Sequence, residues 1–186
     1  MRFLLLSSLG LLFSISVFAQ TENQYRIIPS ITDWIEEINN WPDSIYEVKN
    51  IKVLLDVKKD YMLIESYDPS KYTVRENIAA IVNKSVTVEG IELDNSFGVT
   101  NEIKAIKNIH FKGWLRISDY ISRPVSGFSF KNMIFDDRFS IRGSDRFTYF
   151  NFIYCEFNNS VGFFDFTVGA NIAIDRSEIN DYLQIT

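Results

Sequence analysis

The chain has 186 residues, of which 46% are hydrophobic and 15% aromatic, and its net charge is −5. This length fits one domain with its own core, and the aromatic content excludes a disordered chain. The acidic balance argues against nucleic acids and anionic membranes as partners. A single cysteine excludes an intrachain disulfide, and a single histidine excludes a metal site built from several histidines.

Residues 1–19 have the pattern of a signal peptide. Arg2 gives a basic start, residues 3–13 are mostly apolar, and Ala19 is a small residue at the expected cleavage point before Gln20. The alternative is a membrane anchor, but serines and a glycine interrupt a run that is shorter than the ~20 apolar residues of a bilayer span. We therefore expect a secreted or periplasmic protein with no membrane insertion after signal cleavage.

One helix is predicted, over residues 33–40. Asp33 is suited to the N-cap, and the apolar Trp34, Ile38 and Trp41 fall on one face of the helix. Because the exposed end of a stack of strands needs a cover, we expect these three side chains to lie over the first turn of the repeats that follow.

Short strands are expected at residues 51–55 and 61–64, which are rich in apolar residues. With the helix they make residues 20–85 an N-terminal segment that caps the repeats. The repeats occupy residues 86–186 and form a single domain with that segment.

The repeat is defined by five apolar reference positions at intervals of 18, 24, 22 and 22 residues: Leu93, Phe111, Phe135, Phe157 and Ile179. Further apolar residues recur four and six positions after each reference position, and five and seven positions before it, with one exception at Lys104. In the first unit the two preceding residues are Val86 and Val88. Such alternation predicts a strand on each side of the reference position.

A polar corner follows every reference position. Its residues tolerate tight backbone turns and read Asp94-Asn95, Lys112-Gly113, Asp136-Asp137, Asn158-Asn159 and Asn180-Asp181. Strands separated by regular corners predict a mainly β chain of stacked coils of about 22 residues, a solenoid. A leucine-rich-repeat-like solenoid is the alternative, although the alternation after each corner favours a further strand over a helix.

The segments at residues 155–159 and 177–181 place a small residue, Cys155 or Ser177, two positions before an apolar one. In this respect the chain resembles secreted bacterial pentapeptide-repeat-like proteins and right-handed parallel β-helix proteins. The resemblance covers roughly residues 86–186 and implies a short right-handed parallel β-helix with an N-terminal capping helix.

The sequence shows no pair or set of residues that is typical of a catalytic centre, so we assign no catalytic, cofactor-binding or metal-binding residue. His110 precedes a reference position and is expected to face outward, and Cys155 is expected to be a small core residue. Asp136 and Asp137 could serve a polysaccharide lyase or glycoside hydrolase, or bind calcium, but their place in the corner column explains them without chemistry.

The function expected is therefore that of an exported, non-catalytic solenoid that presents a binding or structural surface to a protein or glycan. Its aromatic residues outside the core columns are candidates for that surface: Trp114, Tyr120, Phe147 and Tyr149. A carbohydrate-active enzyme is the alternative. The last unit ends at Thr186 with open strand edges, which predicts either an end-to-end homodimer or continuation into a longer solenoid.

Overall fold

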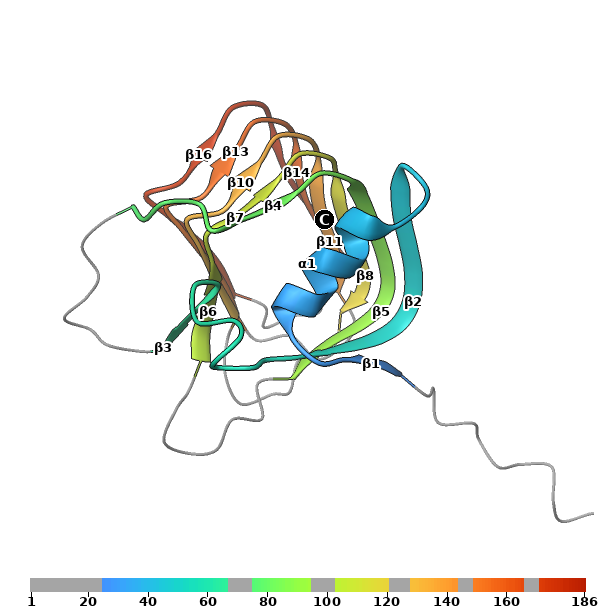
Figure 1. The fold of residues 1–186 in the computed structure, drawn as a ribbon. Coiled ribbons are helices and arrows are strands. Elements are labelled where there is room, and N and C mark those ends of the chain that lie inside the picture. The colour runs from blue at the N-terminus through green and yellow to red at the C-terminus, as the bar shows by residue number, and fades with distance from the viewer. Residues whose placement is uncertain (1–24, 67–74, 95–102, 121–127, 144–148, 166–170) are drawn as a thin grey trace, which may run out of the picture.

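The computed structural model describes residues 25–66, 75–94, 103–120, 128–143, 149–165 and 171–186. The predicted signal peptide lies outside these residues. The described chain is mainly β, with one helix and with strands that pair in parallel except for one pair (Figure 1). No helix within these ranges is long and apolar enough to cross a membrane.

The strands form three sheets. The seven-stranded sheet consists, in spatial order, of β1 (Arg26–Ile28), β2 (Ile45–Leu54), β5 (Ser85–Asp94), β8 (Leu115–Tyr120), β11 (Phe139–Gly143), β14 (Val161–Phe164) and β17 (Leu183–Ile185). The β4 sheet consists of β4 (Ala80–Val82), β7 (Ile109–Phe111), β10 (Ile134–Phe135), β13 (Glu156–Phe157) and β16 (Glu178–Ile179). The β3 sheet consists of β3 (Ile64–Ser66), β6 (Ile103–Lys107), β9 (Phe128–Lys131), β12 (Tyr149–Ile153) and β15 (Asn171–Asp175).

From β6 onward the chain visits the β3 sheet, the β4 sheet and the seven-stranded sheet in turn. We call one such visit to all three sheets a pass. Each strand pairs in parallel with the equivalent strand of the next pass, as β9, β12 and β15 do in the β3 sheet. Buried apolar residues from all three sheets form one core cluster. In Figure 1 the strands of successive passes lie one behind another. The antiparallel pair is β3 with β6.

The predicted columns are confirmed in the last four units. Phe111, Phe135, Phe157 and Ile179 are directly paired between neighbouring strands of the β4 sheet. The rings stack face to face, with centroids 5.5 Å apart for Phe111 and Phe135 and 4.9 Å apart for Phe135 and Phe157. The apolar positions after each corner also form strands, namely β8, β11, β14 and β17, as the alternation predicted.

The first unit was predicted wrongly. Val82, not Leu93, pairs with Phe111 and starts this column, and Val86 and Val88 pair with Leu115 and Ile117, which follow the next corner. Asp94 likewise lies in a strand, paired with β2, and not at a corner.

The cause is a bend within a continuous strand. Gly90 has φ +72° and lies against Asn50 of β2, which also has a positive φ of 50°. Glycine adopts this conformation without steric cost, so β5 bends here and continues through its full ten residues. Alternation alone cannot tell such a continuing strand from the next strand of a pass.

The single helix, α1, spans Ile31–Asn40, and its N-cap is Ser30 instead of the predicted Asp33. The Ser30 hydroxyl accepts a hydrogen bond from the Asp33 N–H at 2.9 Å and donates one to the Asp33 carboxylate at 2.6 Å. Asp33 is therefore the third residue of the helix, and its side chain bonds to the hydroxyl of the N-cap residue.

The apolar face of α1 belongs to the common core. Trp34 and Ile38 are buried in the same cluster as the sheet residues, and α1 contacts β1, β2 and β4. Trp41 packs against that cluster, edge-on to Tyr46 of β2 with ring centroids 5.0 Å apart.

The strand expected at residues 61–64 is mostly wrong. Tyr61 and Met62 lie in an exposed turn, and β3 starts only at Ile64. The predicted strand at residues 51–55 is the second half of β2.

Asparagines form a stack at the corner between the β3 and β4 sheets. Asn108 and Asn132 have left-handed backbones (φ 62° and 52°), are fully buried, and are joined by a hydrogen bond from Asn132 Nδ2 to Asn108 Oδ1 at 2.8 Å. Asn132 Nδ2 also donates to the carbonyl of Glu76 at 2.7 Å. Tyr154 and Arg176 occupy the equivalent left-handed positions of the next two passes.

Replacing Asn132 with alanine is expected to lower the free energy of unfolding by about 2–4 kcal/mol. A left-handed backbone costs an L-residue other than glycine or asparagine about 1–2 kcal/mol, and the two acceptors lose a buried donor. Asn132→Gly also removes the buried donor but avoids the cost of the left-handed backbone. It should therefore be about 1–2 kcal/mol more stable than Asn132→Ala in urea unfolding. Equal stability of the two variants would show that the left-handed backbone at residue 132 does not disfavour alanine.

Candidate functional site

His110 and Asp136 come together at the corner between the β4 sheet and the seven-stranded sheet. His110 Nε2 lies 2.9 Å from Asp136 Oδ2, close enough for an ion pair, although the ring N–H does not meet hydrogen-bond geometry. The same carboxylate accepts hydrogen bonds from Lys112 Nζ at 3.0 Å and from Asn158 Nδ2 at 3.3 Å. None of these three partners is a carboxylate.

The corner residues support one another along the stack of passes. Asn180 Nδ2 donates to Asn158 Oδ1 at 2.8 Å, which continues the chain of side chains that begins at Lys112 and Asp136. Partial burial acts to raise the pKa of Asp136, but the neighbouring His110 and the hydrogen bonds from Lys112 and Asn158 outweigh it and hold that pKa below its ordinary value. The arrangement favours the ionised form of the Asp136 carboxylate, which links the side chains of the corner.

Asp137 has a local role in the same corner. Its Oδ1 accepts the N–H of Arg138 at 2.7 Å, a contact typical of a turn. Among the described residues, no group of three or more histidine, cysteine, aspartate or glutamate side chains is placed to hold a metal ion.

Cys155 is buried in the core, where its thiol contacts the carbonyls of Phe130 and Ile153. Burial raises the pKa of the thiol to about 12. The geometry is that of an unreactive core residue, as expected for this position.

Cys155 is therefore expected to resist alkylation by iodoacetamide at pH 8 in the folded protein, because the thiolate is the nucleophile and is scarce well below its pKa. Mass spectrometry should find the modified cysteine only after denaturant is added. Rapid modification of the native protein would contradict this burial.

The aromatic residues predicted to form a surface are placed only in part. Trp114 is half-buried beside the seven-stranded sheet, and its indole N–H donates to Thr87 Oγ1 at 3.4 Å. Tyr120 and Tyr149 lie in β8 and β12. Phe147 lies outside the described residues.

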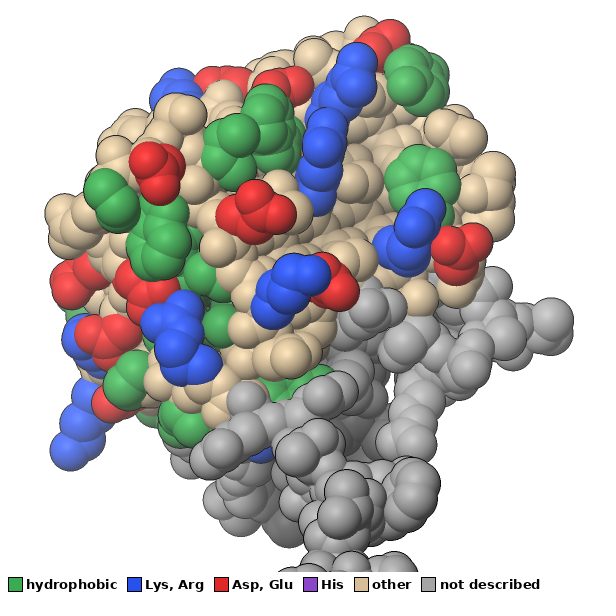
Figure 2. All heavy atoms as spheres, turned by 90° about the vertical axis from the view of Figure 1, so that its right-hand side faces the viewer, with side chains coloured by type: hydrophobic (Ala, Val, Ile, Leu, Met, Phe, Trp, Pro, Cys, Tyr) green, Lys and Arg blue, Asp and Glu red, His purple; other side chains and the backbone are tan. Residues whose placement is uncertain are grey.

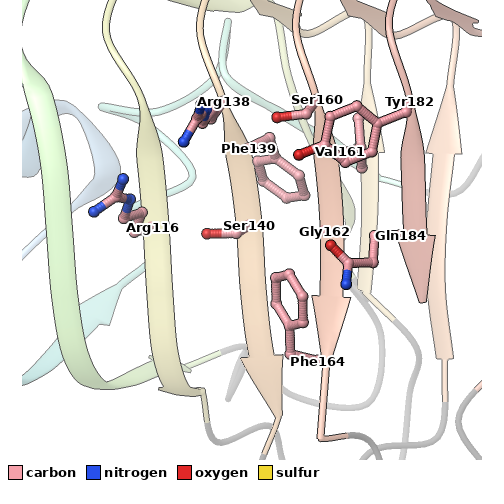
Figure 3. A pocket seen from close by; sticks show the side chains of 10 residues that line it. All are labelled: Arg116, Arg138, Phe139, Ser140, Ser160, Val161, Gly162, Phe164, Tyr182 and Gln184. Carbon is pink, nitrogen blue, oxygen red and sulfur yellow. The ribbon is translucent and has the colours of Figure 1, made fainter. Parts of the chain in front are cut away.

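A pocket that the sequence analysis missed opens on the outer face of the seven-stranded sheet. Its volume is about 200 Å³, and it extends over the neighbouring strands β8, β11, β14 and β17 (Figure 3). Its lining includes two cations, three aromatic residues and small polar groups: Arg116, Arg138, Phe139, Ser140, Ser160, Val161, Gly162, Phe164, Tyr182 and Gln184. Figure 3 shows the arginines on one side and Tyr182 and Gln184 on the other.

Strand pairing sets this arrangement. Arg116, Ser140, Gly162 and Gln184 are paired across β8, β11, β14 and β17, so they form one row of outward positions. Arg138 precedes β11 at the corner, and its carbonyl accepts the Leu115 N–H at 2.9 Å. Arg138 is thus one strand away from Arg116 and displaced toward the corner.

The two arginines differ from the other cations of this sheet. Lys52 is paired with Glu92 at 3.0 Å, and Arg142 with Asp165 at 3.0 Å. Within the described part of the chain, no carboxylate pairs with Arg116 or Arg138. Figure 2 shows this side of the molecule, where basic and acidic side chains are scattered over a mostly neutral surface.

Arg116 has a neighbour of another kind. Its guanidinium carbon lies 5.0 Å from the centre of the Trp114 ring, within the range of a cation–π contact. The ring, held by Thr87, thereby supports the side chain of Arg116. The indole leaves the charge of the guanidinium unneutralised.

The ring of Phe164 covers the backbone at Gly162. A Cβ atom placed on Gly162 would overlap this ring, and no other side chain or backbone atom would be nearly as close. The absence of a side chain at Gly162 thus leaves room for the Phe164 ring next to the backbone of β14, within the pocket (Figure 3).

The sequence carried only a weak signal of this pocket. The repeat was found from its buried columns, whereas the pocket lies on the outward row between them, which reads Arg, Ser, Gly and Gln. The available signal was the location of two arginines, 22 residues apart, at outward positions of an acidic chain.

No protein-family model matches the chain, and neither the curated proteins nor the solved structures contain a match.

Proposed function

We propose that the protein is an exported, non-catalytic parallel β-solenoid that binds an anionic ligand on the outer face of its seven-stranded sheet. The solenoid part of the proposal draws support from the strands that pair with their equivalents 22 residues later in all three sheets. In this proposal the solenoid is right-handed, as in the proteins that the sequence resembles.

The helix α1 would cap the first turn of this solenoid. Its Trp34 and Ile38 share the core cluster with residues of the early strands, and such a cover protects the apolar end of stacked strands. Residues 20–85 would then form one domain with the passes that follow.

The binding part of the proposal rests chiefly on one observation: the pocket is lined by two arginines that have no carboxylate partner in the part of the chain that the structure describes. Guanidinium groups bind carboxylates, sulfates and phosphates through paired hydrogen bonds. Two such groups on one open face of an acidic protein favour recognition of a negatively charged ligand.

Both aspartates of the alternative enzyme hypothesis already have partners within the protein. Asp136 contacts His110 and accepts hydrogen bonds from Lys112 and Asn158. Asp137 accepts the backbone N–H of Arg138. Their contacts support the structural role that we propose for them.

A binding screen tests this proposal. The purified protein is titrated with neutral oligosaccharides, acidic oligosaccharides and poly-glutamate, and both thermal stability and reaction products are followed. We expect at least one acidic probe to raise the Tm without being consumed. The double variant Arg116→Gln/Arg138→Gln should lose this shift.

Arg142→Gln is the matched control, because it removes a paired arginine from the same sheet. It should leave the Tm shift intact. Cleavage of a saccharide, or binding that the double variant does not weaken, would reject the proposal.

A further inference from the structure

We infer that the ligand of the outer-face pocket is a saccharide that carries acidic groups, either carboxylates or sulfates. This inference rests on the proposed function and adds the chemical class of the ligand. It is carried by the Phe164 ring next to Gly162, by the two guanidinium groups that have no carboxylate partner among the described residues, and by the polar rim.

The Phe164 ring provides a flat apolar floor. Phenylalanines in the described strands otherwise point mostly into the core, whereas Phe164 pairs with the outward Arg142 and is only half-buried. An aromatic ring on an outer face can contact the C–H face of a sugar ring. A glycine at position 162 is what leaves room for the ring at this place.

The guanidinium groups provide two separate anion contacts. Arg116 lies on β8, and Arg138 lies at the corner just before the neighbouring strand β11. The two guanidinium groups are therefore staggered, and one small anion need not contact both. Anionic groups on successive units of one ligand could meet them in turn, each through charge-assisted hydrogen bonds.

The rim offers groups that suit hydroxyls. Ser140 and Gln184 supply a hydroxyl and an amide on the outward row, and Tyr182 adds an exposed aromatic ring with a phenolic hydroxyl. The four strands of the pocket span about 14 Å at the usual strand spacing, which accommodates more than one sugar ring.

An acidic peptide fits the same surface less well. The central strands β11 and β14 are each paired on both sides, so their backbone groups are already bonded within the sheet. A peptide laid across this face would find no strand edge to pair with, and its own backbone groups would lose water without replacement.

Four probes distinguish the possible classes of ligand: a uronic-acid oligosaccharide, its neutral methyl ester, a sulfated oligosaccharide and poly-glutamate. Calorimetric titration of the protein should show binding of the uronate or the sulfated oligosaccharide. The methyl ester should bind about tenfold or more weakly than the uronate, the order expected for loss of hydrogen bonds to a charged group.

The variants Phe164→Ala and Gly162→Ala test the aromatic floor, the first by removing the ring and the second by displacing it. Each substitution should lower the affinity for the acidic saccharide by about tenfold while leaving any binding of poly-glutamate unchanged. Because the two substitutions act differently on the strand, failure of one to fold leaves the other as the test.

The outcomes are distinguishable. If poly-glutamate binds through Arg116 and Arg138 but neither acidic saccharide does, or if the floor variants bind the saccharide as the unaltered protein does, this inference fails and the proposed function stands. If no acidic probe binds, or if binding is independent of both arginines, the inference and the proposed function fail together.

Discussion

Replacing Phe157 with alanine is expected to lower the free energy of unfolding by about 3–5 kcal/mol, as large-to-small changes in packed cores do. Phe157 is 1% exposed and lies in the middle of the aromatic column. Its ring stacks on Phe135 at 4.9 Å and contacts Phe139 and Phe152, each with centroids 5.6 Å away. Neighbours from all three sheets cannot close the resulting cavity without moving the strands.

Phe164→Ala is the matched control, because it makes the same chemical change on the outer face, where the ring is only half-buried. It should cost about 1 kcal/mol or less. Urea unfolding measures both variants. A cost for Phe157→Ala as small as that of the control would show that the aromatic column is not packed as described.

Replacing Asp60 with alanine is expected to cost about 3–4 kcal/mol. The carboxylate is fully buried and accepts hydrogen bonds from the N–H groups of Ile31 at 3.0 Å, Thr32 at 2.9 Å and Asp56 at 3.0 Å, and from the Thr32 hydroxyl at 2.7 Å. Bonds to a charged acceptor contribute roughly 1.5–3 kcal/mol each, partly offset by the cost of burying the charge. The negative charge also lies at the positive end of α1.

Two variants calibrate this effect. Asp60→Asn keeps one carbonyl acceptor and should lose about half as much stability. Asp56→Ala removes a neighbouring carboxylate that accepts exposed hydrogen bonds from the backbone N–H groups of Lys58 and Lys59. This substitution should cost about 1 kcal/mol or less. A cost for Asp60→Ala no greater than that for Asp56→Ala would mean that this carboxylate does not hold the start of the helix.

The later units were predictable because their apolar columns repeat at nearly constant length. The 22-residue interval from Phe135 to Phe157 and on to Ile179 is the interval between paired strands in the structure. The first unit was not predictable in this way, because the bend at Gly90 keeps β5 continuous and moves Leu93 out of the column. Alternation specifies which residues face inward but not which sheet they join.

Local rules also failed where a distant residue decides the geometry. Ser30 and Asp33 both suit an N-cap, and in the structure Ser30 is the N-cap while Asp33, three residues later, bonds to its hydroxyl. Asp60 meets the start of α1 from almost 30 residues away, so no local pattern could assign it. The asparagine stack was likewise missed, because Asn108 and Asn132 resemble ordinary corner residues in sequence.

The pocket depends on outward positions, for which burial imposes no pattern. Arg116 and Arg138 stand out only once the structure shows that, among the described residues, they have no carboxylate partner while the other cations of the sheet do. The importance of Gly162 becomes apparent only from the adjacent ring of Phe164. The sequence could therefore suggest a binding surface, but it could not indicate the face of the molecule on which we propose the site.

NMR spectroscopy can locate a bound ligand on the outer face of the seven-stranded sheet. Backbone amide shifts of the ¹⁵N-labelled protein should be recorded while the acidic oligosaccharide that raises the Tm is added. We predict that the largest changes fall on Arg116, Ser140, Gly162 and Gln184, the outward row of the pocket. Changes concentrated instead at the corner of Asp136 would place the site elsewhere and contradict the account.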